Sequence, residues 1–327
     1  MNYFNFLGTL FGEEFAMRVA VFGVGGVGGY FGWRLTQAGE DVVFVARGEN
    51  FRVLRTHGLT MDTPDGKTVV QPVQVVEDPA EVGPVDAVLL GVKAWQVPEA
   101  AHTIRPFIGP ETFVVPLQNG VEAPVQIAEV LGWKHAFGGL CYIVAFKIGP
   151  GHIRHAGMEP YVAFGEFNQC AGDRGRFLEE AFLRAKVKVE IPGDIQAAMW
   201  EKFLFIASLS GVAAITRAPV GVVRSVPETR LMLEEIMKEI CSVAIARNIH
   251  LKDDAINSTM SIIDRLPSAT TTSMQRDIME GRPSELLAHN AAVARLGMEV
   301  GLPVPLNTFI YRSLLPLELC ARGKVTF

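Results

Sequence analysis

A glycine-rich turn between a short apolar strand and a helix constrains this chain more than any other feature. The apolar run at residues 19–22 leads into Gly-Val-Gly-Gly-Val-Gly, and a stretch with helical spacing follows. In such a unit Gly23 permits the tight turn, Gly25 admits a pyrophosphate to the backbone, and Gly28 lets the helix approach the strand. The context favours dinucleotide binding over a tight turn without a ligand. The phosphates are expected to lie against Gly23, Gly25, Gly26, Val27 and Gly28.

Strands and helices alternate after this turn. Buried-strand patterns at residues 42–45, 86–92 and 112–115 are interspersed with helical patterns at 97–104 and 123–131. This alternation is typical of βαβ units and predicts an α/β fold with a Rossmann-type, doubly wound parallel sheet. Residues 47–54 are expected to be irregular, residues 59–76 to form a hairpin that turns at 64–66, and mixed strands to follow at 136–146, 151–155, 161–165 and 187–190.

The character of the sequence changes near Pro192-Gly193, after which helical periodicity dominates. Helices are predicted at residues 195–214, 228–248, 253–266, 285–300 and 306–318. We therefore predict a Rossmann-type NADP-binding domain at residues 17–192 and an all-helical substrate and catalytic domain at residues 193–327. Residues 1–16 lack the basic segment and cleavage site of a signal peptide and are interpreted as an extension.

Composition excludes several classes of function. With 30 Lys and Arg against 35 Asp and Glu, the net charge of −5 argues against nucleic acid as a partner. The longest apolar stretch, residues 203–214, is shorter than the ~20 residues of a membrane span and is predicted to be a core helix. Four dispersed cysteines, Cys141, Cys170, Cys241 and Cys320, indicate reduced thiols and a cytoplasmic location. No metal site is expected, because His152 and His155 would point to opposite faces of a strand.

Three polar residues follow the carboxyl ends of predicted parallel strands, where open α/β sheets bind ligands. Arg47 stands where NAD enzymes usually carry an acidic residue, and its guanidinium suits a 2′-phosphate, which favours NADP(H). Lys93 is suited to meet cofactor or substrate, and the amide of Asn119 to orient the ribose or nicotinamide. The alternatives are a solvated loop lysine for Lys93 and a turn signal for Asn119-Gly120.

A lysine enters the apolar helix predicted at residues 195–214. Lys202, Ile206 and Ser210 are spaced four residues apart and share one face of that helix. By itself this pattern favours a lysine at the helix end, reaching for solvent, over a functional ammonium.

Several short motifs together resemble the ketopantoate reductase family, the NADPH-dependent 2-dehydropantoate 2-reductases. The resemblance covers the chain from Met17 and rests on the glycine turn, Val-Lys-Ala-Trp-Gln-Val at 92–97, Gln-Asn-Gly at 118–120, Trp-Glu-Lys at 200–202, Thr-Ser-Met-Gln-Arg-Asp at 272–277, and Glu285. It implies hydride transfer from NADPH to the 2-keto carbon of ketopantoate, giving pantoate. It further implies that Lys202 is the general acid and that Glu285 supports substrate binding and catalysis. By the same resemblance Ser273 binds the substrate carboxylate, Lys93 and Asn119 line the cleft for cofactor and substrate, and Arg47 binds the 2′-phosphate.

The chain departs from this family at two substrate-contacting asparagines, which are replaced by Ile206 and Ser210. Serine can still hydrogen-bond to a substrate, whereas isoleucine cannot, so the substrate is less certain than the reaction. Two alternatives therefore stay open: a reductase of a different 2-keto acid, and a protein that senses NADP(H) without catalysis. A homodimer formed by the helical half is a further expectation.

Overall fold

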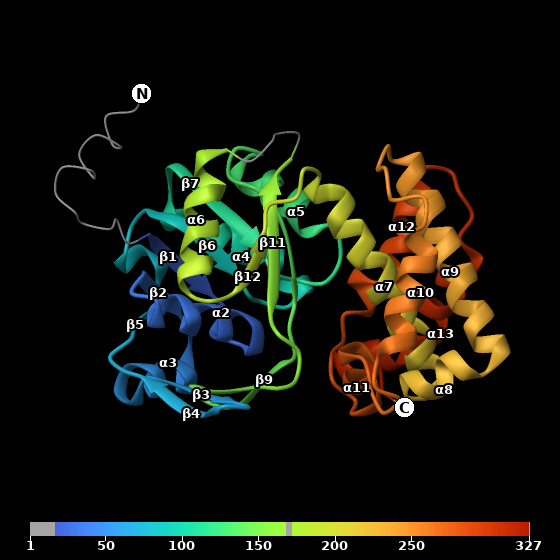
Figure 1. The fold of residues 1–327 in the computed structure, drawn as a ribbon, viewed down its shortest axis with the longest axis horizontal. Coiled ribbons are helices and arrows are strands. Elements are labelled where there is room, and N and C mark those ends of the chain that lie inside the picture. Colours follow the sequence, from blue (N-terminus) through green and yellow to red (C-terminus); the bar gives the residue numbers. More distant parts are fainter. Residues whose placement is uncertain (1–16, 168–171, 327) are drawn as a thin grey trace. The chain divides into compact units, whose positions relative to one another are not determined.

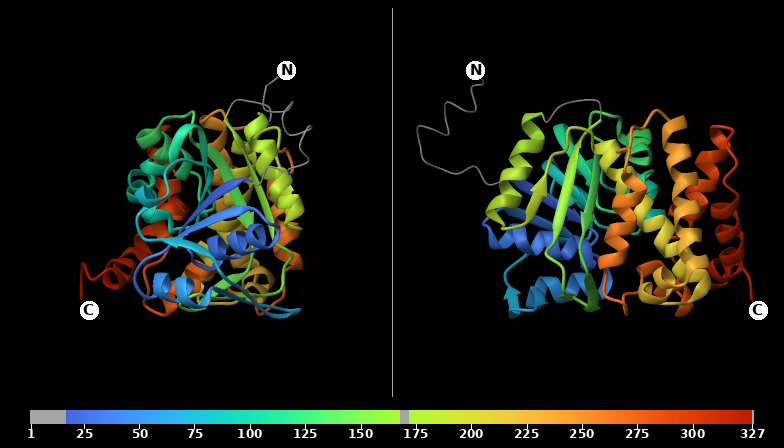
Figure 2. Two further views of the ribbon diagram at one scale, coloured as in Figure 1. Left: turned by 90° about the vertical axis from the view of Figure 1, so that its left-hand side faces the viewer. Right: turned by 45° about the vertical axis from the view of Figure 1, so that its right-hand side comes forward.

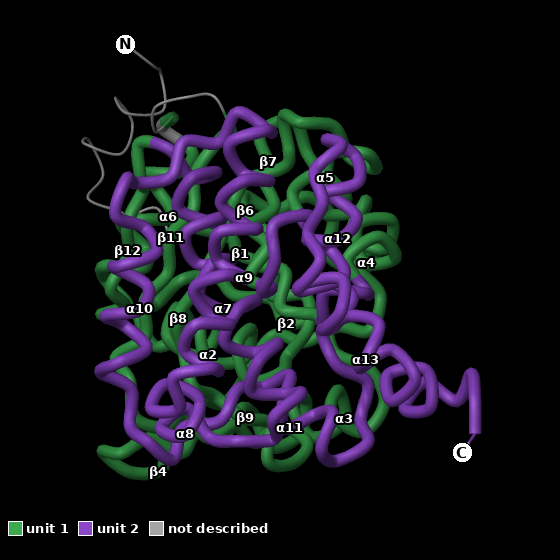
Figure 3. Tube along the Cα trace, turned by 90° about the vertical axis from the view of Figure 1, so that its right-hand side faces the viewer, with its two compact units in different colours: residues 1–92, 97–117, 124–193 green, residues 93–96, 118–123, 194–327 purple. Residues whose placement is uncertain are grey.

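The computed structural model describes residues 17–167 and 172–326 (Figure 1). The extension inferred at residues 1–16 and the thiol of Cys170 lie outside the described residues. The chain divides into two compact units, drawn in two colours in Figure 3. Unit 1 comprises residues up to 92, 97–117 and 124–193; unit 2 comprises residues 93–96, 118–123 and 194 onward. Two short segments in the first half of the chain therefore belong to the helical unit.

A five-stranded parallel sheet forms the centre of unit 1, as the doubly wound α/β prediction requires. Its strand order is β5-β2-β1-β6-β7, so the chain leaves β1 toward one edge and later returns to pair β6 on the other side. Ligands bind at the carboxyl ends of strands beside such a reversal. The strands are β1 (Arg18–Phe22), β2 (Asp41–Val45), β5 (Gln74–Val76), β6 (Val85–Leu90) and β7 (Ile108–Pro116).

Two smaller sheets complete the strands of unit 1. One has the order β4-β3-β10-β9 and the other β12-β11-β8, and both mix parallel with antiparallel pairs, as predicted. Their strands are β3 (Leu59–Thr63), β4 (Gly66–Val70), β8 (Phe137–Tyr142), β9 (Ala145–Gly149), β10 (His152–His155), β11 (Tyr161–Glu166) and β12 (Lys188–Glu190).

The helices of the first half include α4 (Val97–Thr103) and α5 (Ala123–Leu131), close to their predicted bounds. Among the described residues the chain enters its first helix at α2 (Gly26–Gln37). Residues 47–54 were wrongly predicted to be irregular: residues 48–54 lie in helix α3 (Gly48–His57), which buries Leu54, and residue 47 is its N-cap. Helix α6 (Asp173–Arg184) was not predicted. Short 3-10 turns lie at η1 (Pro79–Glu81), η2 (Ala94–Gln96) and η3 (Arg105–Phe107).

The hairpin predicted at residues 59–76 is shorter than expected. Strands β3 and β4 form it and turn where predicted, but residues 74–76 form β5, which leaves the hairpin to pair with β2. Apolar patterning does not distinguish these two pairings, because it indicates which face of a strand is buried and not which strand lies beside it.

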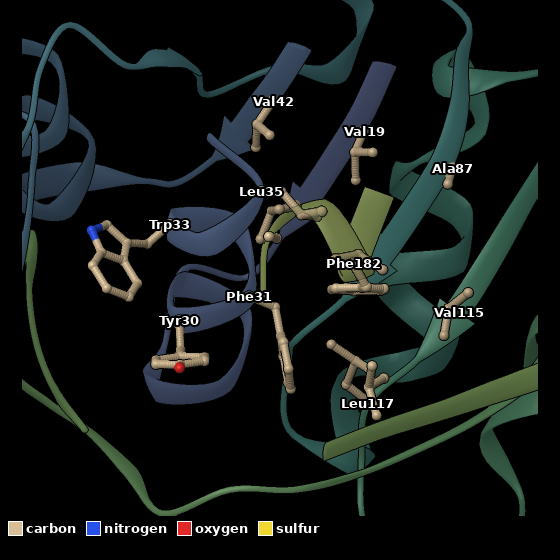
Figure 4. Packing of buried hydrophobic residues seen from close by; sticks show 14 of the residues in the cluster. Val19, Tyr30, Phe31, Trp33, Leu35, Val42, Ala87, Val115, Leu117 and Phe182 are labelled. Carbon is tan, nitrogen blue, oxygen red and sulfur yellow. The ribbon is translucent and has the colours of Figure 1, made fainter. Parts of the chain in front are cut away.

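The core of unit 1 joins α2 and α6 to the sheet (Figure 4). The rings of Phe31 and Phe182 meet edge to face at 5.7 Å, and both side chains are fully buried. A Cβ at Gly32 would collide with the ring of Phe44, so glycine is needed where α2 crosses β2. The glycine turn at the start of α2 is therefore held rigidly against the sheet.

After residue 193 the described part of unit 2 consists of helices joined by loops, and these residues form no strand (Figures 1 and 2). Most of its predicted helices are present, but α8 and α11 were not predicted, and the helix expected at 285–300 is broken at His289. The helices are α7 (Ile195–Thr216), α8 (Val220–Ser225), α9 (Pro227–Ala246), α10 (Ala255–Arg265), α11 (Ser273–Met279), η4 (Leu286–Ala288), α12 (Asn290–Glu299) and α13 (Pro305–Ala321).

Helix α7 is the central element of unit 2 and contacts α9, α11 and α13. Among the described residues it is the one helix long and apolar enough to cross a membrane, but 72% of its most apolar 18-residue stretch is buried within the protein. This burial is what the prediction of a core helix requires.

A buried polar network fixes the start of α12 against α7. The side-chain amide of Asn290 donates to the Ala207 carbonyl at 3.3 Å and to Asn307 Oδ1 at 2.9 Å. Asn307 in turn donates through its own amide group to Glu239 at 2.7 Å. Because buried polar groups are costly unless paired, these bonds select one packing of α12 on α7.

Candidate active site

The glycine turn has the backbone conformation that glycine favours. Gly23 has a φ of +100°, and a Cβ there would lie 2.9 Å from backbone atoms of Gly91 and Val92. Gly25 is the N-cap of α2, makes no side-chain cap, and has open space where a Cβ would project. The amides of the first turn of α2 thus face a position that a phosphate oxygen can approach.

Two other glycines of the turn serve packing. A Cβ at Gly26 would collide with the carbonyl of Ala145, and one at Gly28 with the carbonyl of Gly23. Val27 is half-buried in the first turn of α2. The residues present therefore fit a dinucleotide: open backbone at Gly25, an uncapped helix N-terminus, and close packing behind it.

Arg47 lies at the start of a helix rather than in a loop. It is the N-cap of α3, and its side chain is exposed. The next amide, that of Gly48, donates to Glu77 Oε1 at 2.9 Å. Asn50 links this helix to the glycine turn through the Val24 carbonyl at 3.3 Å. A guanidinium at a helix N-terminus suits a phosphate, and Glu77 already places one carboxylate there.

The carboxylate of Glu285 is held by two amides in unit 2. The Ala94 amide donates to its Oε1 at 3.4 Å, and Asn119 Nδ2 donates to its Oε2 at 3.3 Å. Glu285 is the N-cap residue of η4, yet its side chain makes no cap bond there. Glu285 as a whole is only 8% exposed. Its side chain therefore does not act as a simple helix cap, and its position depends on the loops that contain residues 93–96 and 118–123.

Lys93 pairs with an acidic residue of α11. Its Nζ lies 3.4 Å from Asp277 Oδ2, and its side chain stays about half exposed. Asp277 also accepts from Arg282 at 2.8 Å, and Lys93 lies 5.7 Å from the centre of the Trp95 ring. An exposed ammonium whose partner is shared with another cation is well suited to meet an anionic ligand.

Lys202 and His289 are buried in the unit that also buries Glu285. Lys202 is 6% exposed on α7. His289 is fully buried at the residue where the helical conformation is interrupted between η4 and α12. Burial lowers the pKa of His289 from its usual 6.5 to about 4; the charge of Glu285 opposes this shift, and those of Lys202 and Lys93 add to it. The imidazole is thus neutral at pH 7 and lies within the electrostatic reach of all three charges.

The face of α7 that carries Lys202 also carries Ile206 and Ser210. Ser210 is fully buried, and its hydroxyl has no hydrogen-bond partner within residues 17–167 and 172–326. The same holds for both ring nitrogens of His289. Ser208, in contrast, donates to the Leu204 carbonyl at 2.7 Å. An unpaired buried polar group costs ~1–3 kcal/mol, so a bound ligand or water that reached Ser210 would recover that cost.

Ser273 lies in the first turn of α11 and is half-buried. The Thr272 hydroxyl caps this helix by accepting from the Gln275 amide, and the Thr272 amide donates to Gln275 Oε1, which completes a capping box. Thr-x-x-Gln is a local signal for a helix start, so α11 could have been found from the sequence. Sequence reasoning assigned no role to Asp277 or His289; for His289 no local signal exists.

The described residues contain no group of three His, Cys, Asp or Glu side chains that could hold a metal ion. His152 pairs with Asp62 at 2.9 Å, whereas His155 is bonded to the Met158 carbonyl on the other face of β10. The two histidines therefore point apart, as predicted. Cys141, Cys241 and Cys320 form no disulfide among the described residues, and the Cys141 thiol donates to the Leu117 carbonyl at 3.6 Å.

Comparisons with known proteins agree with this architecture. The family model of ketopantoate reductase PanE/ApbA matches residues 19–169, and the model of the C-terminal domain of ketopantoate reductase PanE/ApbA matches residues 194–318.

Individual relatives align along most of the chain. The uncharacterized oxidoreductase YkpB of Bacillus subtilis is 29% identical over 302 residues, which covers 91% of this chain and 98% of that protein. A 2-dehydropantoate 2-reductase of Nostoc is 26% identical over 91% of this chain and 94% of its own length. The crystal structure of a PanE/ApbA family ketopantoate reductase from Ralstonia eutropha is similar with a TM-score of 0.85 and 28% identity, covering 94% of this chain and 100% of that one.

Proposed function

The chain belongs to the ketopantoate reductase family, whose oxidoreductases use NADPH, and we propose that it reduces ketopantoate to pantoate. One observation carries the proposal: unit 2 buries the cation Lys202 and the carboxylate Glu285, which two amides hold in place, and both charges act on the buried His289. An ammonium in a partly desolvated site is the group that reduction of a ketone requires, because the carbonyl oxygen gains negative charge.

Lys202 is the proton donor in this proposal. Its ammonium hydrogen-bonds the keto oxygen, stabilises the developing alkoxide and transfers a proton to it, so that the 2-hydroxy acid leaves and Lys202 becomes neutral until solvent reprotonates it. Proton donation of this kind typically contributes ~10²–10⁴-fold to the rate. Bound NADPH supplies the hydride.

Glu285 provides the negative charge that favours the protonated form of Lys202. Because the amides of Ala94 and Asn119 hold Glu285, its carboxylate needs no reorganisation during the reaction. His289 is neutral at pH 7 and so adds no positive charge that would oppose the ammonium.

The substrate carboxylate is an anion and is assigned to the basic and hydroxyl groups nearby. Lys93, Ser273 and Asn119 are the residues proposed to bind it together with the cofactor. Lys93 would exchange its ion pair with Asp277 for the ligand, at small cost because the Lys93 side chain is about half exposed and Asp277 keeps its bond to Arg282. On unit 1 the proposed cofactor residues are Gly23, Gly25, Gly26, Val27, Gly28 and Arg47.

A different 2-keto acid is the second candidate substrate. Ile206 offers no hydrogen bond on the face of α7 that carries Lys202, and Ser210 offers one buried hydroxyl. A face with one apolar and one hydroxyl group favours a 2-keto acid with a more apolar side chain. The retained Lys202, Ser273 and Glu285 argue against a protein that only senses NADP(H).

A substrate panel tests the proposal. Purified protein with NADPH is given ketopantoate, 2-ketoisovalerate, 2-ketoisocaproate and phenylpyruvate, and oxidation is followed at 340 nm. We expect the highest kcat/KM with ketopantoate. A higher value with an apolar keto acid would favour the second candidate, and NADPH binding without oxidation by any keto acid would favour the sensor.

The variant Lys202→Ala tests the proton donor. We expect kcat to fall about 10²–10⁴-fold while NADPH affinity stays within about twofold. Lys252→Ala is the matched control, because Lys252 is an exposed lysine of the same unit that pairs with Glu201 at 2.9 Å. Equal rates for the two variants would remove Lys202 from the mechanism.

A further inference from the structure

A buried carboxylate of α13 contacts the turn that carries Glu285. Glu318 is 1% exposed and accepts from the backbone amide of Ser284 at 2.9 Å and from its hydroxyl at 2.5 Å. The Ser284 hydroxyl in turn accepts from the Leu286 amide at 3.3 Å. The residues on both sides of Glu285 are therefore bound, directly or through Ser284, to one carboxylate.

Arg322 balances this buried charge. Its Nε donates to Glu318 at 2.6 Å, and its Nη2 donates to the Ser284 carbonyl at 3.3 Å. Its guanidinium also lies 4.5 Å from the centre of the Trp95 ring. A planar cation can bond a carboxylate at its edge while its face stacks on an aromatic ring, which lysine cannot do.

These contacts meet at the loop that donates to Glu285. Trp95 follows Ala94, whose amide bonds Glu285 Oε1 at 3.4 Å. Arg322 thus contacts both the turn before Glu285, at Ser284, and the loop 93–96, which donates to the Glu285 carboxylate. A donor displaced by ~1 Å can cost ~10²-fold in rate, so groups that fix both sides of a catalytic carboxylate affect the reaction without touching the substrate.

We propose that Glu318 is a positioning residue for Glu285, acting through Ser284 and paired with Arg322, which extends the same support to the loop of Trp95. The inference rests on the proposed function, because the role of Glu285 comes from it. Glu318 itself contacts neither substrate nor cofactor in this proposal.

A double-mutant cycle tests it. Glu318→Gln keeps the acceptor oxygen and the size of the side chain but loses the charge that attracts Arg322. We expect kcat to fall about 10-fold in the wild-type background and less than about twofold in a Glu285→Gln background, because there the group being positioned is absent. NADPH affinity and the unfolding midpoint separate this effect from a general loss of structure. Arg312→Gln, an exposed arginine on the same helix, is the control expected to leave kcat unchanged.

Hydrogen exchange gives a readout that does not depend on activity. In Glu318→Gln the amides of Leu286 and Ala94 should exchange at least about 10-fold faster, while those of α9 keep their wild-type rates. Unchanged exchange at both amides, or an equal fall of kcat in both backgrounds, would overturn the inference. If the wild-type protein reduced no 2-keto acid, the proposed function would fail. Hydrogen exchange alone would then decide whether Glu318 holds the turn that carries Glu285. If Glu318→Gln did not fold, Ser284→Ala would be taken through the same two measurements.

Discussion

Asn119 and Glu285, which lie 166 residues apart in the chain, are joined by a hydrogen bond of 3.3 Å from the side-chain amide to the carboxylate. An asparagine whose neighbour is glycine reads as a turn residue in the sequence, and Gly120 does have a φ of +108°. The same asparagine also orients a carboxylate. Because of this bond, the charge and the position of the Glu285 carboxylate depend on which side chain stands at position 119.

Asn119→Asp should place a second carboxylate beside Glu285. Two close carboxylates raise the pKa of one of them, so at pH 7 both are charged only at a cost to the site. We expect kcat/KM to fall about 10- to 100-fold at pH 7 and to recover partly toward pH 5. Asn119→Ala, which loses the bond without adding charge, should show no such recovery. Parallel pH profiles for the two variants would contradict this account.

Arg47→Ala should weaken NADPH binding far more than NADH binding. A charge-assisted bond to a 2′-phosphate is worth ~1.5–3 kcal/mol, which corresponds to a loss of about 10- to 100-fold for NADPH. We expect less than a twofold change for NADH, measured by fluorescence titration. Arg55→Ala, at the other end of α3, is the control. Equal losses for both cofactors would make Arg47 structural.

Glu77→Gln should have the opposite effect. Glu77 accepts from the Gly48 amide beside Arg47, so its charge opposes a phosphate at the same helix N-terminus. Removing that charge is worth ~0.3–1 kcal/mol, and we expect the Kd for NADPH to fall about two- to fivefold while that for NADH stays constant. Gln retains the acceptor oxygen, which preserves the bond to Gly48. Equal changes for the two cofactors would count against a phosphate at this place.

His289 should make the protein less stable in acid. Its pKa is about 4 when folded, because burial disfavours the charged form, and about 6.5 when unfolded. Between these values the unfolded chain binds the proton and the folded chain does not, so stability falls as pH drops from 6.5 to 4, by up to about 3 kcal/mol.

Urea unfolding at several pH values between 4 and 7 measures this effect. His289→Leu should flatten the decline in stability over that range, whereas the exposed His250→Gln should leave its slope as in the wild type. If the slope of His289→Leu matched that of the wild type, the titration of His289 would not contribute.

Features with local signals could be predicted from the sequence. The strand, glycines and helix of the turn are adjacent in the chain, and α5 begins and ends at the predicted residues. The site residues Lys93 and Asn119 could be singled out because each follows a recognisable buried strand. Their partners Asp277 and Glu285 could not be derived this way, since each pair joins segments more than 160 residues apart.

The break at His289 shows why the remaining features were missed. Apolar spacing over residues 285–300 fits one helix. Asn290, however, is hydrogen-bonded to α7 and to Asn307, and the backbone leaves the helical conformation at the residue before it. That adjustment results from tertiary contacts rather than from local preference. Similarly, β5 pairs with β2 rather than with the adjacent hairpin. Pairing choices of this kind are decided by the whole fold.

The position of α7 within the chain has a consequence during synthesis. When a ribosome has added Thr216 the helix is complete, but α9, α12 and α13, which will cover it, have not been made. At ~5–20 residues per second, the chain through the end of α13 requires roughly 5–20 s more. During that interval a 22-residue apolar helix lacks its partners while unit 1 is already complete enough to fold. Translation of the helical half is therefore the stage at which the most apolar helix of this protein stays uncovered for longest.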